Sequence, residues 1–169
     1  HLASISGGTD IISCFMLGNP LKPVHPGEIQ GPGLGMAIAA FDDLGNPVID
    51  RPGELVCTKP FISMPIGFYN DPKNLKYHST YFQHFPNQQV WTHGDQISFT
   101  ANGGIIVLGR SDSTLNPGGI RIGTSELYRQ LETNPIIIDS IIAPFRINGD
   151  EAIIACLQLA KGYTLNTQM

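Results

Sequence analysis

The residues best suited to chemistry in this sequence lie in short, glycine-rich clusters of polar side chains. The first cluster is Gly7-Gly8-Thr9-Asp10, which sets backbone N–H groups, a hydroxyl and a carboxylate side by side. Such a turn can bind a phosphate, or a phosphate that carries a metal ion. The same residues also suit an ordinary turn after a strand, so this motif alone leaves both interpretations open.

The second cluster is Thr92-His93-Gly94-Asp95, where a carboxylate follows a glycine at the expected start of a strand. A carboxylate can accept hydrogen bonds from both hydroxyls of a ribose, and a turn aspartate that bonds its own backbone is the plain alternative. His93 could act as a general base, but no Ser or Cys nucleophile lies in a recognisable elbow. A catalytic histidine is therefore disfavoured.

Two arginines lie beside glycines further along the chain. Arg110 follows a glycine, and Arg121 closes the run Gly118-Gly119-Ile120. Guanidinium groups bind phosphate and ribose oxygens, although ordinary surface arginines would look the same. Glu126 fits a charge in the first turn of a helix better than a catalytic acid. The aromatic run over 77–82 is interpreted as packing.

The scaffold that positions these clusters must be rich in turns and short strands. Among 169 residues there are 19 glycines and 13 prolines, which argues against a helical bundle. The Asn102-Gly103 turn, between apolar runs, is the clearest hairpin signal. Strands are predicted at 36–41, 53–58, 95–100, 105–108, 120–122, 136–143 and 151–160, and helices at 71–82 and 124–132. The predicted fold class is α+β, with a β-rich part over 1–110 and an α+β part after a polar stretch at 111–119.

Composition argues against several classes of protein. The ten Lys and Arg residues are scattered and the net charge is −4, which disfavours binding to a nucleic-acid backbone. No apolar run approaches the roughly 18 residues that span a bilayer. The three cysteines lie far apart in sequence, which disfavours a disulfide scaffold and fits a reducing compartment. We expect a cytoplasmic protein with small-molecule partners, and neither nucleic acid nor membrane.

The order of the clusters is more specific than any one of them. A Gly-Thr-acid turn, a Gly-Glu-Leu strand at 53–55 and the Thr-x-Gly-Asp segment precede Gly-Arg-x-Asp at 109–112, Gly-x-Arg at 119–121 and a helix with a glutamate. This order resembles the acyl-adenylate-forming superfamily, which includes acyl-CoA synthetases and nonribosomal peptide adenylation domains. The resemblance extends over nearly the whole chain. The runs at 4–14, 53–60 and 108–117 resemble most the ligases that act on acetoacetate.

The resemblance implies a domain division. Residues 1–110 would form the barrel-like, β-rich end of the large AMP-binding domain, and 111–169 would hold the hinge and the start of a small α+β domain. The phosphate-loop lysine and the acyl-activating lysine of the family are not found in the sequence. We therefore expect an internal or C-terminal fragment that does not catalyse adenylation alone and whose partner is the remainder of its own full-length chain.

The resemblance also assigns roles in nucleotide binding. Thr9 would contact a nucleotide phosphate together with the backbone of Gly7 and Gly8. Asp10 stands where most members of the family have Glu, and it would hold Mg²⁺ through one carboxylate. Asp95 and Arg110 would bind the ribose hydroxyls of ATP or AMP.

Three further residues would serve the second step of the family's reaction. Asp112 would be the hinge between the domains, because a polar stretch with few contacts can change its backbone angles. Arg121 would approach phosphate in one domain orientation. Gly119 would leave room for the arm of CoA.

The implied reaction joins an acid to CoA in two steps. The carboxylate attacks the α-phosphate of Mg·ATP and gives acyl-AMP and pyrophosphate, and the CoA thiol then attacks the acyl-adenylate. Acetyl-CoA synthetases resemble this chain but carry a tryptophan where it has Ser6-Gly7-Gly8, so the resemblance favours a longer acid, acetoacetate. The alternatives are a synthetase for acetate or propionate, and a non-catalytic β-rich binding module.

Overall fold

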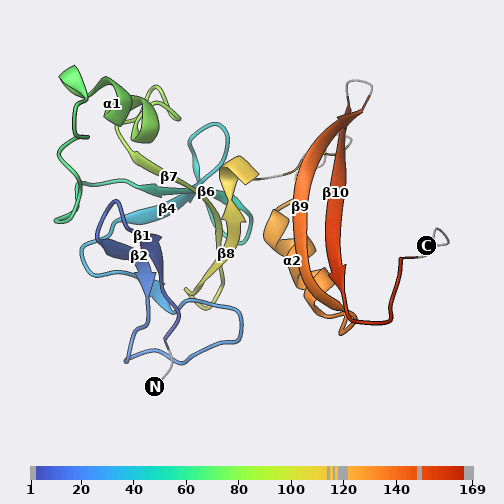
Figure 1. Ribbon diagram of the computed structural model, residues 1–169. Helices are drawn as coiled ribbons and strands as arrows, with labels where there is room; N and C mark the ends of the chain where they lie inside the picture. The colour runs from blue at the N-terminus through green and yellow to red at the C-terminus, as the bar shows by residue number, and fades with distance from the viewer. Residues whose placement is uncertain (1–2, 114, 116, 118–121, 148–149, 166–169) are drawn as a thin grey trace. The chain divides into compact units, whose positions relative to one another are not determined.

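The computed structural model describes residues 3–113, 115, 117, 122–147 and 150–165, without the side chains of 150 and 151. The chain divides into two compact units, His1–Val107 and Leu108–Met169 (Figure 1). Gly119, Arg121 and most of the strand predicted at 120–122 lie outside the described residues.

The first unit is built on antiparallel sheets. A small sheet has the order β1-β2-β3, and a larger sheet has the order β5-β4-β6-β7-β8. Their bounds are β1 (Ser6–Gly8), β2 (Ser13–Leu17), β3 (Gly31–Pro32), β4 (Ile38–Phe41), β5 (Pro47–Val48), β6 (Gly53–Cys57), β7 (Trp91–Phe99) and β8 (Ile105–Arg110). Over the described residues neither sheet closes on itself, so the barrel-like form expected from the sequence is an open arrangement here.

The predicted strands at 36–41, 53–58 and 105–108 are confirmed within a few residues. The hairpin at Asn102-Gly103 is also confirmed, since the Gly103 N–H donates to Thr100 O at 2.8 Å. The strand predicted at 95–100 begins earlier, at Trp91. The β1–β2 hairpin is not predicted by the sequence pattern, because its connection needs Ile12 at a φ of 49° and carries no strong turn dipeptide.

The helix predicted over 71–82 is shorter than expected. Pro72–Asn74 forms a single 3₁₀ turn, and the α-helix α1 runs only from Leu75 to Tyr81. Lys73 and Asn74 have φ values of 65° and 54°, which a continuous right-handed helix cannot contain. The Asp71 carboxylate accepts hydrogen bonds from the backbone N–H groups of Lys76 and Tyr77 at 3.0 and 2.8 Å. These bonds satisfy two N–H groups in the first turn of α1.

The core of the first unit is rich in aromatic rings where α1 meets β7. Trp91 is 1% exposed, and Tyr77 and Tyr81 of α1 are 5% and 7% exposed. The Trp91 ring stacks on Tyr81 and meets Phe61 edge to face at 5.5 Å between centroids. The predicted packing role of the aromatic run is therefore confirmed.

The second unit pairs one helix with one hairpin. After the 3₁₀ turn Ser111–Ser113 come α2 (Thr124–Glu132), β9 (Ile137–Ile147) and β10 (Asp150–Leu159). The Ile142 N–H of β9 donates to the Tyr128 hydroxyl of α2 at 2.9 Å. The helix predicted at 124–132 is confirmed, and both strands are present with shifted ends. Among the described residues, no helix has the length and apolar character needed to cross a membrane.

Candidate functional site

A β-bulge in β7 shapes the segment that contains Asp95. Residues 54 and 56 of β6 pair with 96 and 92 of β7, so β7 holds two more residues than β6 over this interval. Within the bulge, Gly94 has a φ of +83°, and its N–H donates to the Glu54 carboxylate at 3.0 Å. Bulges redirect side chains and recur beside active sites. The expectation that Asp95 begins the strand is wrong, because Asp95 lies in the middle of β7.

The bulge leaves Asp95 buried beside His93. Asp95 is 8% exposed, and its Oδ2 lies 3.8 Å from His93 Nε2. On the other side of the ring, the Trp91 indole N–H points at His93 Nδ1 at 3.5 Å. His93 thus lies beside Asp95, the residue predicted to bind ribose. The sequence pattern did not predict that these two side chains are neighbours.

The Gly7–Asp10 turn approaches the same histidine. A Cβ added to Gly8 would overlap the Asp10 carboxylate and lie 2.8 Å from His93 Cε1. Gly8 therefore allows the β1–β2 turn to lie directly against β7. The structure thus brings together the first two sequence clusters, which are more than eighty residues apart.

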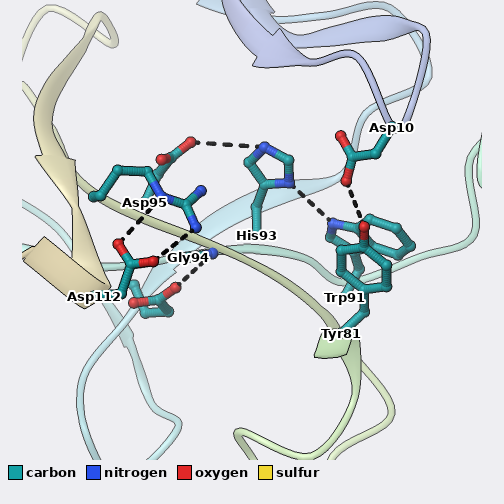
Figure 2. A network of polar contacts seen from close by, with 9 residues as sticks. Asp10, Tyr81, Trp91, His93, Gly94, Asp95 and Asp112 are labelled. Atoms are coloured by element: carbon teal, nitrogen blue, oxygen red, sulfur yellow. Dashed lines mark hydrogen bonds and ion pairs between the residues drawn. The ribbon is translucent and has the colours of Figure 1, made fainter. Parts of the chain in front are cut away.

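Tyr81 of α1 links Asp10 to this network. Its hydroxyl donates to Asp10 Oδ2 at 2.6 Å, and its ring stacks on Trp91 at 3.7 Å between centroids, 15° from parallel. Figure 2 shows the resulting series of contacts from Asp10 through Tyr81, Trp91 and His93 to Asp95. Sequence reasoning missed Tyr81 as a site residue, because an aromatic run on a helix is more simply read as core.

The other predicted site residues differ in their surroundings. Thr9 is exposed on the β1–β2 turn, and a Cβ on Gly7 would overlap the Ser13 carbonyl oxygen of β2. In the second unit, Arg110 Nε and Nη2 donate to the Asp112 carboxylate at 3.3 and 3.4 Å. Both partners are largely exposed, so this pair contributes little to stability. The predicted roles of all of these residues stay predictions.

The donor set at Asp10 fits a magnesium ion that arrives with phosphates. Among the described residues, no group of three or more His, Cys, Asp or Glu could hold a metal by itself. Mg²⁺ in nucleotide sites is typically bound by one or two carboxylates, with phosphate oxygens and waters completing the shell. A single exposed carboxylate that accepts a hydrogen bond from Tyr81 matches that requirement.

The sequence was compared with family models and with known proteins. No protein-family model matches the chain. The chain is 53% identical over 165 residues to the acetoacetyl-coenzyme A synthetase of Rhizobium meliloti (strain 1021), covering 98% of this chain and 25% of the relative. It is 48% identical to the acetoacetyl-CoA synthetase of Mus musculus over 170 residues, 99% of this chain and 25% of that protein.

Solved structures show the same correspondence. The acetoacetyl-CoA synthetase from Streptomyces lividans superposes with a TM-score of 0.87 at 44% identity, over 98% of this chain and 24% of that one. The anthranilate CoA ligase AuaEII, in complex with anthranoyl-AMP, has a TM-score of 0.74 at 22% identity over 93% of this chain and 28% of its own. The second likeness concerns the fold alone.

Over nearly its whole length the chain is similar to CoA ligases in sequence and in fold, and the predicted α+β fold class is confirmed. The chain spans about a quarter of the length of the curated relatives it matches. The particular proteins that it resembles are the acetoacetyl-CoA synthetases.

Proposed function

We propose that the full-length protein containing this chain is an ATP-dependent acid–thiol ligase that activates acetoacetate as acyl-AMP and transfers it to CoA. The observation that supports this most strongly is the 53% identity to an acetoacetyl-CoA synthetase over 98% of the chain. The site agrees with it, because a carboxylate on a glycine-rich turn and a buried carboxylate on β7 flank one histidine. The three free cysteines fit the cytoplasm as the proposed compartment.

In the proposed first step, an acyl carboxylate oxygen attacks the α-phosphorus of ATP, and the bond to pyrophosphate breaks. Asp95 and Arg110 hold the ribose hydroxyls, and Thr9 contacts a phosphate with the N–H groups of Gly7 and Gly8. Asp10 holds Mg²⁺, which neutralises phosphate charge when bound. These residues orient the nucleotide so that the α-phosphorus faces the acid.

In the second step, the CoA sulfur attacks the acyl carbon and AMP leaves with the phosphate oxygen. Asp112 is proposed as the hinge that lets a second domain orientation form, with Arg121 near phosphate and Gly119 beside the CoA arm. We propose that the large-domain segment ends at 110 and that the hinge and small domain follow. The boundary between the two compact units, at 107 and 108, supports this division.

The proposed acyl group lies beside Ser6-Gly7-Gly8. Neither glycine accepts a side chain without displacing its neighbours, because an added Cβ would overlap Ser13 O or the Asp10 carboxylate. An indole at this turn would need a different hairpin geometry. We propose that the extra carbons and the ketone of acetoacetate occupy the place that the tryptophan takes in the acetyl-CoA synthetases.

The test is acid-dependent exchange of pyrophosphate into ATP by the full-length protein, with acetoacetate, acetate, propionate and butyrate offered separately. We expect strong exchange with acetoacetate and weak exchange with the other three. Stronger exchange with another acid would overturn the assignment of acetoacetate as the substrate, and the proposed adenylate-forming reaction would stand. The absence of exchange with all four acids would overturn the proposed function.

Gly94 offers a sharp test of the bulge. Replacing Gly94 with alanine places a residue that has a Cβ atom at a φ of +83°. This strain costs roughly 1–2 kcal/mol of conformational energy. The bulge is expected to relax and move Asp95, so that ATP affinity in the full-length protein falls about tenfold, the equivalent of one net hydrogen bond. The measurement is calorimetric titration with Mg·ATP.

The matched control is Gly35→Ala. Gly35 has a φ of +79°, and a Cβ there would meet no atom within 4 Å. It carries the same backbone strain at a surface turn away from Asp95, so stability should fall and ATP affinity should not. Equal losses of affinity in both variants would show that the bulge has no special part in nucleotide binding.

A further inference from the structure

Asp10 belongs to the turn that connects β1 and β2. Its side chain is exposed, and both flanking strands are short. Catalytic constellations need carboxylates whose position is fixed by neighbouring groups.

Among the described residues, the Tyr81 hydroxyl meets that need. It donates to Asp10 Oδ2 at 2.6 Å, a short distance typical of a hydrogen bond to an ionised carboxylate. The bond occupies one oxygen and leaves Oδ1 on the side of Gly8, where an added Cβ would collide with it. Hydroxyl and carboxylate are 71 residues apart in sequence, so only the packing of α1 against β7 brings them together.

Tyr81 is itself held rigidly. Its ring is 7% exposed and stacks on Trp91 at 3.7 Å, which leaves little freedom to the hydroxyl. Trp91 in turn points its indole N–H at His93, the neighbour of Asp95. A shift of Tyr81 would therefore displace both Asp10, which it contacts directly, and the neighbours of Asp95.

We infer that Tyr81 is a positioning residue, whose hydroxyl holds the Asp10 carboxylate in the orientation that binds the metal of Mg·ATP. This inference rests on the proposed function, since the role of Asp10 does. It goes beyond that function by naming a residue outside the glycine-rich motifs.

The test uses Tyr81→Phe in the full-length protein, because this change keeps the ring on Trp91 and removes only the hydroxyl. The matched control is Tyr77→Phe, which removes a buried hydroxyl from the same helix, where Tyr77 donates to the Pro65 carbonyl instead. Affinity for Mg·ATP and for metal-free ATP in EDTA is measured by calorimetry, and Mn²⁺ bound in the presence of ATP is measured by EPR. Asp10→Asn and the double variant Asp10→Asn/Tyr81→Phe complete the set.

We expect Tyr81→Phe to weaken binding of Mg·ATP and of Mn²⁺ roughly tenfold, the scale of a hydrogen bond to a charged group, with metal-free ATP unaffected. Tyr77→Phe should leave both affinities unchanged even where it lowers thermal stability. In the Asp10→Asn background, loss of the Tyr81 hydroxyl should have no further effect on metal affinity.

Two results would overturn the inference alone. One is that Tyr81→Phe binds the metal with normal affinity while Asp10→Asn binds it weakly. The other is an equal loss of Mg·ATP and metal-free ATP binding in Tyr81→Phe, which would indicate a purely structural role. If Asp10→Asn also binds Mg·ATP normally, or the unmodified protein does not bind it, the proposed role of Asp10 fails and the inference fails with it.

Discussion

Replacing Trp91 with alanine is expected to lower the free energy of unfolding by about 3–5 kcal/mol, the usual cost of removing a buried large aromatic ring. Trp91 is 1% exposed, stacks on Tyr81 and meets the edges of Phe61 and Phe82 at 5.5 and 5.8 Å. It also lines a pocket of about 580 Å³.

Urea unfolding followed by far-UV circular dichroism measures this change. Tryptophan fluorescence is unsuitable, because Trp91 is the single tryptophan of this chain and the variant lacks it. Tyr69→Ala is the control, because Tyr69 is fully exposed and its removal should change stability by less than about 0.5 kcal/mol. Trp91→Phe should retain much of the packing while losing the indole N–H. Equal stability of Trp91→Ala and Tyr69→Ala would contradict the core described here.

Replacing Asp95 with alanine in the full-length protein is expected to lower kcat/KM for ATP by roughly 100- to 1000-fold, because the carboxylate proposed to accept hydrogen bonds from the two ribose hydroxyls is removed. Asp95 is 8% exposed in the bulge of β7, a position from which a carboxylate can bind without competing bulk water. The measurement is acetoacetate-dependent pyrophosphate exchange at varied ATP.

The nucleotide itself supplies the control for Asp95. If the carboxylate binds the two ribose hydroxyls, the unmodified protein should prefer ATP strongly over 2′,3′-dideoxy-ATP, and Asp95→Ala should lose most of that preference. A variant that is impaired but still prefers ATP by the same factor would show that Asp95 acts elsewhere. Overall folding of the variant is checked by its circular dichroism spectrum.

Features governed by near neighbours could be predicted from the sequence. The hairpin at Asn102-Gly103 was predictable because a turn dipeptide lies between two apolar runs, and α2 was predictable from its polar start and apolar spacing. The clusters around Asp10 and Asp95 were found for the same reason, since each is a short run of adjacent residues. Their order along the chain then indicated the superfamily.

The arrangement of the site depends on tertiary structure. The bulge at Gly94 requires Glu54 from another strand, and the break before α1 follows from the backbone of Lys73 and Asn74. Tyr81 reaches Asp10 across 71 residues, and this contact exists because α1 packs on Trp91. Local propensities carry no information about such register and packing, which arise from burying one shared core. The sequence by itself therefore determined which residues are suited to the chemistry, and the tertiary structure decided which residues hold them in place.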